Sequence, residues 1–362
     1  MDQFVVSARK YRPSTFASVV GQQHITTTLK NAIQSNQLPQ AFLFCGPRGV
    51  GKTTCARILA KTINCTNITS DTEACNECES CRSFNNMVSM NIFELDAASN
   101  NGVEAIRSLI EQVYIPPQAG KYKIYIIDEV HMLSTAAFNA FLKTLEEPPS
   151  YAKFILATTE KHKVIPTVIS RCQVFDFKRI QVSDIVHHLE YIAQQEGIQY
   201  EPDALQLIAR HAEGGLRDAL STFDQLVSFT QGNLTLDSCC ENLNVLNADY
   251  YFKLVDCFQR NDVAQSLLIY EDIANRGLNA QHFLTGLTEH LRNLMVALDP
   301  ATHTLLDVSD NYRPRYGEQA AACGLPALLW YLNIASDYEF KYKEAGNKRL
   351  FVEVALMKLA AG

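Results

Sequence analysis

Few of the features that place a protein in a class at first sight occur in this sequence. No apolar run approaches the roughly 20 residues that a helix needs to cross a membrane. The N-terminal residues do not follow the pattern of a secretory signal peptide, and no internal repeat or low-complexity tract is found. These absences lead us to expect a globular cytoplasmic chain without a membrane partner.

Positive charge is also scarce. The formal net charge is −7, which excludes binding to nucleic acid through a general excess of basic residues, although a local patch can still dominate the field near a groove. One basic patch lies near the N-terminus, at Arg9, Lys10 and Arg12. On charge pattern alone, phosphate contacts and a solvated basic tail are equally good interpretations of these residues.

The sequence does have enough apolar material for a core and enough length for two or three domains. It contains 362 residues, of which 47% are apolar, a composition too hydrophobic for a disordered chain. Buried-strand patterns alternate with helix patterns up to about residue 177, and helix patterns dominate from residue 182 onward. We therefore expect an α/β domain followed by helical ones.

The first informative motif is a glycine-rich turn between an apolar run and a helical segment. Residues 46–53 fit the pattern G-x-x-x-x-G-K-[ST], with a strand pattern before them and a helix pattern at 55–63. Such a turn directs backbone N–H groups and a helix N-terminus at phosphate oxygens. Lys52 is expected to bind the β- and γ-phosphates, and Thr53 to hold Mg²⁺. The expected nucleotide-binding residues of this turn are Gly46, Pro47, Gly49, Val50, Gly51, Lys52, Thr53 and Thr54.

Two carboxylates close the apolar run at residues 123–127. Asp128 and Glu129 follow this buried-strand pattern, and open α/β sheets bind their ligands at the carboxyl ends of the strands. Asp128 is expected to orient Mg²⁺ through water, and Glu129 is expected to act as general base for the attacking water. The alternative, two solvated acids at a strand end, is less favoured because an intact phosphate loop precedes them.

Two further polar features are ambiguous from the pattern alone. Thr158 and Thr159 end another buried-strand pattern, and their hydroxyls either approach a γ-phosphate or bond to the backbone. Arg171 follows a short segment with proline at residue 166, and by itself it is an ordinary surface arginine.

The spacing of the 11 cysteines separates them into two groups. Four follow the pattern C-x9-C-x2-C-x2-C in a polar segment, which predicts a structural Zn²⁺ held by four thiolates. Disulfides would suit a secreted chain, and a reduced thiol cluster is the other alternative. The other seven cysteines are scattered and are interpreted mostly as small core residues. The expected zinc ligands are Cys65, Cys75, Cys78 and Cys81.

Taken together, these motifs resemble those of a known family. The glycine-rich turn, Asp128-Glu129, Ser170-Arg171-Cys172 and Gly215-Leu216-Arg217-Asp218 follow one another as in the clamp-loader branch of the AAA+ ATPases. The cysteine module behind the phosphate-loop helix makes the chain similar, within that branch, to the gamma/tau family of bacterial DNA polymerase III subunits. The resemblance covers essentially the whole chain and is strongest over residues 8–225.

The resemblance implies an architecture and a set of partners. It implies an α/β P-loop AAA+ domain at residues 1–179 with the zinc module at about 64–82, a helical lid domain at 180–243 and an all-α collar domain at 244–362. It implies ATP, Mg²⁺ and Zn²⁺ as cofactors. The chain would be the ATPase motor of a hetero-pentameric loader that contains delta and delta-prime subunits. That loader would open a sliding clamp and place it on primed DNA for the other polymerase III subunits.

The resemblance also implies roles for individual residues. Thr159 would be the sensor 1 residue, and Arg217 would be sensor 2, reaching the γ-phosphate from the lid. Arg171 would be an arginine finger that acts on the ATP of a neighbouring subunit. The residues lining the nucleotide in cis would be Arg9, Tyr11, Arg12, Val19 and Val20.

Two other functions stay open at this point. A structural loader subunit similar to delta-prime would share the zinc module and the arginine finger but would lack a working phosphate loop, so the intact motif argues against it. A small-molecule kinase would need an acceptor pocket, and the sequence does not reveal one. ATP affinity of the isolated chain distinguishes an ATPase from the structural subunit. Phosphate release without an added acceptor distinguishes an ATPase from the kinase.

Overall fold

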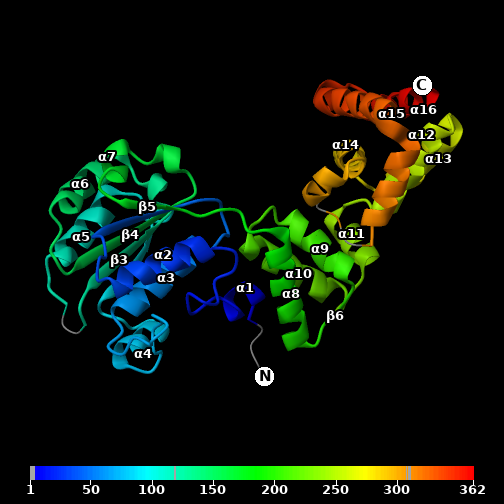
Figure 1. Ribbon diagram of the computed structural model, residues 1–362. Coiled ribbons are helices and arrows are strands. Elements are labelled where there is room, and N and C mark those ends of the chain that lie inside the picture. The colour runs from blue at the N-terminus through cyan, green and yellow to red at the C-terminus, as the bar shows by residue number, and fades with distance from the viewer. Residues whose placement is uncertain (1–4, 118–119, 307, 309–310) are drawn as a thin grey trace. The chain divides into compact units, whose positions relative to one another are not determined.

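The computed structural model describes residues 5–117, 120–306, 308 and 311–362. The chain divides into two compact units (Figure 1). The first comprises Met1–Gln195 and Ala209–Gln225, and the second comprises Glu196–Ile208 and Leu226–Gly362. None of the described helices combines the length and the apolarity that spanning a bilayer requires.

A parallel sheet of five strands forms the centre of the first unit, in the order β2-β3-β4-β1-β5. Its inner strands β1, β3 and β4 are almost wholly buried, which is why they read as continuous apolar runs in the sequence. Asp96 pairs with Asp128 and Cys45 with Thr158, so the carboxyl ends of these strands lie along one edge. The strands are β1 (Ala41–Cys45), β2 (Ile92–Asp96), β3 (Lys123–Asp128), β4 (Ala152–Thr158) and β5 (Gln173–Asp176).

Helices cover both faces of this sheet (Figure 1). Because side chains alternate along a strand, Phe42 and Phe44 of β1 enter the core on one face, whereas Leu43 and Cys45 enter the core on the other. The first face carries α2 (Gln23–Gln34) and α3 (Lys52–Ile63), and the second carries α5 (Val103–Val113), α6 (Thr135–Glu146) and α7 (Pro166–Ile169). The predicted α/β domain with helices on both faces is confirmed.

Several short elements were not predicted. The N-terminal segment, expected to be irregular from residue 9, begins with a single helical turn. A short helix also follows within the cysteine segment. Elements of this length contain too few residues for an apolar period to show in the sequence. They are α1 (Ser7–Lys10), α4 (Glu79–Asn85), and the 3₁₀ turns η1 (Val130–Met132) and η2 (Lys161–Lys163).

The sequence pattern predicts helices at 185–196, 203–212 and 215–229, and the structure confirms all three, although the first begins at Val182. The next helix, α11 (Leu236–Leu243), was not predicted. Its two cysteines are the residues that it buries, and they are too few to show an apolar helical period in the sequence. Thr235 caps it by accepting a hydrogen bond from the Ser238 amide. The confirmed helices are α8 (Val182–Glu196), α9 (Pro202–His211) and α10 (Leu216–Phe229), and two short paired strands are β6 (Gln199–Tyr200) and β7 (Asn233–Leu234).

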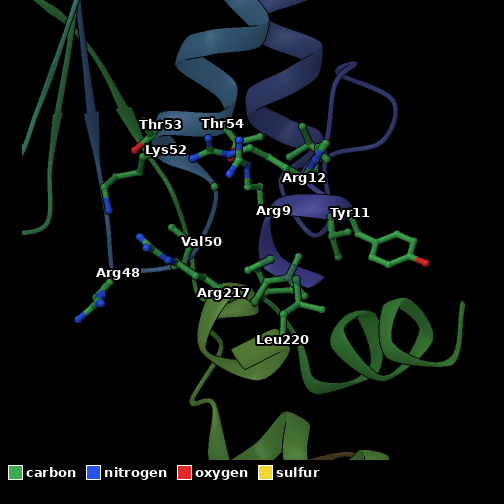
Figure 2. A pocket seen from close by; sticks show the side chains of 18 of the residues that line it. Arg9, Tyr11, Arg12, Arg48, Val50, Lys52, Thr53, Thr54, Arg217 and Leu220 are labelled. Carbon is green, nitrogen blue, oxygen red and sulfur yellow. The ribbon is translucent and has the colours of Figure 1, made fainter. Parts of the chain in front are cut away.

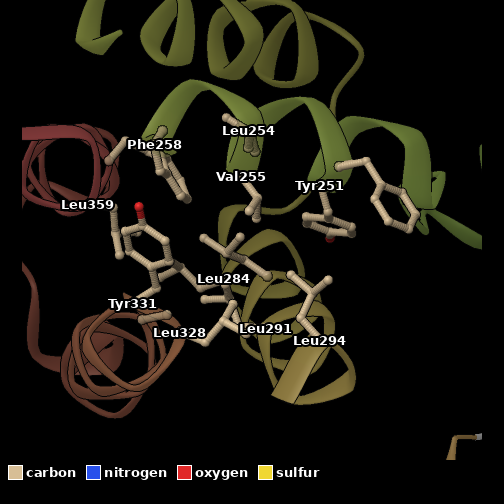
Figure 3. Packing of buried hydrophobic residues seen from close by; sticks show 14 of the residues in the cluster. Tyr251, Leu254, Val255, Phe258, Leu284, Leu291, Leu294, Leu328, Tyr331 and Leu359 are labelled. Atoms are coloured by element: carbon tan, nitrogen blue, oxygen red, sulfur yellow. The ribbon is translucent and has the colours of Figure 1, made fainter. Parts of the chain in front are cut away.

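The second unit is mainly helical, and its core joins α12, α14, α15 and α16 (Figure 3). Phe258, Leu284, Leu328 and Leu359, one from each of these helices, are all buried there. Its elements from residue 248 onward are α12 (Ala248–Gln259), α13 (Val263–Asn275), α14 (Ala280–Ala297), η3 (Pro300–Leu305), α15 (Arg313–Lys341), η4 (Tyr342–Glu344) and α16 (Lys348–Ala361).

In this unit the sequence pattern predicts helix breaks near residues 261, 277, 300, 314 and 326, and the structure confirms the first four as element boundaries. The break expected near Pro326 is instead a kink inside α15. Gly324 has φ +73° and ψ 161°, so the backbone turns two residues before the proline and the helix resumes after it.

Candidate functional site

A cavity of about 430 Å³ lies in the first unit, at the carboxyl ends of β1 and β3 (Figure 2). A cavity of this size is in the range of small-molecule sites. The structure brings most of the sequence-predicted nucleotide residues to its wall. These lining residues are Arg9, Tyr11, Arg12, Val19, Val20, Gly49, Val50, Gly51, Lys52, Thr53, Thr54, Asp128, Glu129 and Arg217.

The glycine-rich turn leaves β1 and enters α3 in a conformation that needs its glycines. Gly46 has φ +149°, and a Cβ at this position would lie 2.5 Å from the carbonyl oxygen of Phe177. Gly51 has φ +101° at the start of α3. Any other residue would be strained at both positions, so the turn requires glycine there.

Lys52 is the first residue of α3 and is 6% exposed. Its Nζ donates hydrogen bonds to the carbonyl oxygens of Gly46 at 2.9 Å and Pro47 at 2.7 Å. Burial lowers the pKa of Lys52, and the nearby Glu129 and Asp128 carboxylates oppose this effect. Gly46 and Pro47 therefore contact this lysine through their backbone and do not themselves line the cavity.

Thr53 and Asp128 meet between the turn and the end of β3. The Thr53 hydroxyl donates to Asp128 Oδ2 at 2.6 Å, and the Glu129 amide donates to Asp128 Oδ1 at 3.0 Å. A hydroxyl and a carboxylate placed together at the mouth of a phosphate loop are the hard oxygen donors that Mg²⁺ prefers. These two residues fit a magnesium ion by donor type and by proximity.

Glu129 is held by contacts from two neighbouring segments. Its Oε2 accepts hydrogen bonds from the Thr159 amide at 3.2 Å and the Thr159 hydroxyl at 2.9 Å. The Nδ1 of His131 lies 3.3 Å from the same oxygen, and its Nε2 lies 3.2 Å from Glu160 Oε2. The Glu129 backbone is left-handed, with φ 47°, which costs about 1–2 kcal/mol in an L-residue. Thr159 thus contacts the carboxylate of Glu129 and does not line the cavity.

Arginines and apolar side chains form the remaining walls (Figure 2). Arg9 and Arg12 come from the segment around α1 and both line the cavity, whereas Lys10 does not. Burial, and next the charge of Arg57, lower the pKa of Arg12. Arg217 is the second residue of α10, and its amide donates to the Gly49 carbonyl oxygen at 3.4 Å.

Arg171 is placed elsewhere. It does not line the cavity, and its guanidinium donates to Glu146 Oε1 at 2.6 Å and to the Thr167 carbonyl oxygen at 2.8 Å. The side chain remains 33% exposed. It is therefore fixed at the surface of the first unit, where a second chain can reach it.

The four clustered cysteines converge. Their sulfur atoms all lie within 4.8 Å of one another, with Cys65 Sγ 3.4 Å from Cys75 Sγ and 3.9 Å from Cys78 Sγ. These distances exclude disulfides, whose S–S bond is about 2 Å, and all four thiols are free. Zinc–sulfur bonds of about 2.3 Å in a tetrahedron put the sulfurs about 3.8 Å apart, so this donor set fits Zn²⁺.

Sequence reasoning missed several residues of the site. Leu216 and Leu220 flank Arg217 on one helix face, and the spacing of four residues was the available signal. Gln22 is fully buried, and its Nε2 donates a hydrogen bond to the Lys178 carbonyl oxygen at 2.7 Å. No pattern in the sequence indicates this contact. The unpredicted lining residues are Val6, Ala8, Pro13, Arg48, Ile180, Leu216 and Leu220.

Comparisons with known proteins agree with this arrangement. The family described as "DNA polymerase III, delta subunit" matches residues 21–181, and the one described as "DNA polymerase III clamp loader subunit, ATPase lid domain" matches residues 184–232. DNA polymerase III subunit tau of Bacillus subtilis is 41% identical over 355 residues, covering 97% of this chain and 62% of that protein.

Two further relatives cover different shares of their own length. Subunit tau of Escherichia coli is 43% identical over 300 residues, which cover 82% of this chain and 46% of that protein. Subunit gamma of Buchnera aphidicola, from Acyrthosiphon pisum, is 37% identical over 292 residues, which cover 80% of each protein. The chain thus spans less than two thirds of the two tau relatives and four fifths of the gamma relative. On these similarities, the chain belongs to the gamma/tau family of DNA polymerase III subunits.

Proposed function

We propose that this chain binds and hydrolyses ATP as a motor subunit of the DNA polymerase III clamp loader. The observation that carries the proposal is the gathering of Lys52, Thr53, Asp128, Glu129 and Arg217 around one cavity beside the glycine-rich turn. A phosphate loop, a metal-binding carboxylate, a candidate base and a free guanidinium are the parts that phosphoryl transfer needs.

Each of these side chains has a distinct proposed task. Lys52 and the turn amides bind the β- and γ-phosphates, and Arg217 contacts the γ-phosphate. Glu129 accepts a proton from the attacking water, and the two hydrogen bonds from Thr159 orient its carboxylate. Thr53 and Asp128 hold Mg²⁺, which when bound neutralises charge on the phosphate oxygens.

The rest of the cavity suits the nucleoside. Val19, Val20, Leu216 and Leu220 offer apolar surface for a base, and Arg9, Tyr11 and Arg12 stand at the same wall. Adenine packed on such aliphatic side chains loses contact with water, which favours binding. We assign these residues to the nucleoside end of ATP and the glycine-rich turn, residues 46–54, to its triphosphate.

The partners follow from the family. Subunits whose names denote the tau, gamma and delta components of DNA polymerase III are similar to this chain. We propose a hetero-pentamer with delta and delta-prime subunits, acting in the cytoplasm, that opens a sliding clamp and loads it on primed DNA with other polymerase III subunits. Residues 1–179 would form the nucleotide-binding domain, 180–243 the lid and 244–362 the collar.

Replacing Lys52 with alanine tests the phosphate role. We expect ATP affinity to fall roughly 10–100-fold, because a hydrogen-bonding cation opposite phosphate is lost. Titration of a fluorescent ATP analogue measures the change. Lys153→Ala is the matched control, since Lys153 is also buried and donates to two carbonyl oxygens, those of Leu38 and Pro39, but does not line the cavity.

The control should keep parental ATP affinity despite losing a similar buried contact. Equal affinity of Lys52→Ala and the parental chain would remove the phosphate role, and no ATP binding by the parental chain would remove the proposed function. Turnover of the reconstituted loader, with and without clamp and primed DNA, then tests the motor function itself.

A structural loader subunit is the second candidate function, and one observation favours it. The family that matches residues 21–181 is described as a delta subunit, whereas the relatives in the comparison are named tau or gamma. A structural subunit would show neither ATP binding nor stimulation of phosphate release by DNA. ATP binding together with DNA-stimulated phosphate release would therefore favour the motor function over the structural one.

The cysteine cluster gives a metal prediction. We propose that Cys65, Cys75, Cys78 and Cys81 hold one Zn²⁺ per chain, contributing on the order of 10 kcal/mol to the local fold. A strong chelator should release one zinc and expose residues 65–85 to protease. Cys78→Ser should lower the zinc content well below one, whereas Cys323→Ser, outside the cluster, should leave it at one. A metal assay reading zero for the parental chain would falsify this assignment.

A further inference from the structure

The wall of the cavity near Val19 and Val20 is a short turn, residues 15–20. Within it the Ser18 hydroxyl donates to the Thr15 carbonyl oxygen at 2.9 Å, and the Val19 amide donates to that of Phe16 at 3.3 Å. Phe16 is 1% exposed and packs in the core on the face of the sheet that α2 and α3 cover. The amides of Phe16 and Ala17 at the start of the turn are not used by these bonds.

One carboxylate satisfies both of these amides. Glu73 Oε2 accepts from the Phe16 amide at 2.9 Å, and Glu73 Oε1 accepts from the Ala17 amide at 3.0 Å. Lys30 Nζ of α2 lies 2.8 Å from Glu73 Oε1, and the glutamate is 9% exposed. A buried carboxylate that meets two neighbouring amides and a cation fixes the position of the backbone that it binds.

Glu73 itself belongs to the cysteine module, two residues before Cys75. Its backbone is held by Thr69, whose amide donates to the Glu73 carbonyl oxygen at 3.0 Å and whose hydroxyl accepts from the Glu73 amide at 3.1 Å. Cys75, one of the four cysteines whose sulfur atoms converge, follows Glu73 by two residues. The position of the carboxylate therefore depends on the fold of the module.

Two further contacts join the cysteine module to α2 and to α3, the helix that follows the phosphate loop. Gln34 of α2 donates to the Thr72 hydroxyl at 2.6 Å, and Lys61 of α3 donates to Asn76 Oδ1 at 2.7 Å. Lys61 is 4% exposed, so this contact is buried on the lysine side. The module thus makes contacts with α2, with α3 and with the turn at residues 15–20.

We propose that Glu73 is a positioning residue through which the cysteine module sets the nucleoside wall of the ATP cavity. The inference rests on the proposed nucleotide binding, and it gives the module a task at that site. Glu73 does not line the cavity, so it acts through the turn and not on the ligand. Its loss should weaken contacts to the nucleoside and spare contacts to the phosphates, which residues 46–54 make.

Glu73→Gln tests this with two ligands, ATP and inorganic tripolyphosphate with Mg²⁺. A glutamine has one acceptor oxygen, so at least one of the two turn amides loses its partner. We expect ATP affinity to fall about tenfold and tripolyphosphate affinity to stay within about twofold, as judged from the cost of one unpaired buried amide. Glu77→Gln, an exposed glutamate between two of the cysteines, is the matched control and should change neither affinity.

Lys30→Met provides the second variant, because it removes the ion pair but leaves both amide contacts. It should lower ATP affinity less than Glu73→Gln does, again without an effect on tripolyphosphate. Retained tripolyphosphate binding also shows that the phosphate loop of each variant is folded.

Equal losses of ATP and tripolyphosphate affinity in Glu73→Gln, or no loss of either, would overturn the positioning role. A parental chain that binds neither ligand would instead overturn the proposed function, so the two failures are distinguishable. Zinc content, measured on the same samples, should remain one per chain in Glu73→Gln. A loss of zinc would overturn the positioning role, because the variant would then act by unfolding the module.

Discussion

Replacing Arg171 with alanine should lower ATP hydrolysis by the assembled loader about 10³–10⁵-fold, the range known for arginine fingers. ATP affinity of the isolated chain should not change, because Arg171 is absent from the wall of its own cavity. The guanidinium stabilises charge that develops in the transition state, so its removal affects the rate and not the binding of the substrate.

The surroundings of Arg171 support an action on another chain. Its side chain lies at the end of a short helix, α7, and is oriented by Glu146 and the Thr167 carbonyl oxygen. Glu146→Gln should weaken this orientation and lower the hydrolysis rate by a smaller factor. Arg82→Ala, which removes an exposed arginine from α4, is a control that should leave the rate unchanged.

Mixing two inactive variants tests the assignment in trans. Lys52→Ala lacks a working phosphate loop but keeps its finger, and Arg171→Ala has the reverse defect. A loader assembled from both should regain hydrolysis at the interface where an intact loop meets an intact finger. A mixture no more active than the sum of the two separate loaders would show that Arg171 does not act across the interface.

Replacing Glu129 with glutamine should lower hydrolysis about 10²–10⁴-fold, the usual contribution of a general base. Glutamine keeps an oxygen that can accept from Thr159, so the local geometry and ATP binding should persist while proton acceptance is lost. Single-turnover phosphate release, measured together with ATP affinity, separates the two effects.

Glu160→Gln is the matched control for this variant. Glu160 lies on the other side of His131, with its Oε2 3.2 Å from Nε2, and it does not line the cavity. Its replacement should change the rate by less than about threefold, since the contacts that it weakens, to His131, His162 and Lys163, are partly exposed. Similar losses in both variants would mean that the network around His131, and not the Glu129 carboxylate, limits hydrolysis.

The motifs that lie close together in the chain could be predicted from the sequence. The glycine-rich turn at residues 46–54 and the helix start that follows it form one local pattern, which the sequence shows directly. The same holds for the four cysteines, whose short spacing brings their sulfur atoms together with little help from the rest of the fold. The inner strands and the longer helices were also predictable, because each buried strand is a continuous apolar run and each helix repeats an apolar period.

Contacts between distant segments could not be predicted in this way. The bonds of Glu73 to Phe16 and Ala17 join residues 57 and 56 positions apart, and the Thr159–Glu129 bonds span 30 positions. None of these residues carries a motif that marks the pairing. The resemblance to the family implied that Thr159 is near the reaction, but only the structure showed that it holds the carboxylate of Glu129.

By itself, therefore, the sequence determined the phosphate loop, the acidic strand end, the thiol cluster and the type of most elements, since each depends on neighbours along the chain. The tertiary structure alone decided that Thr159 holds the carboxylate of Glu129, and that Glu73 of the cysteine module binds the turn at residues 15–20. The physical reason is that hydrogen bonds between distant segments depend on the packing of the sheet and its helices, which no local pattern encodes.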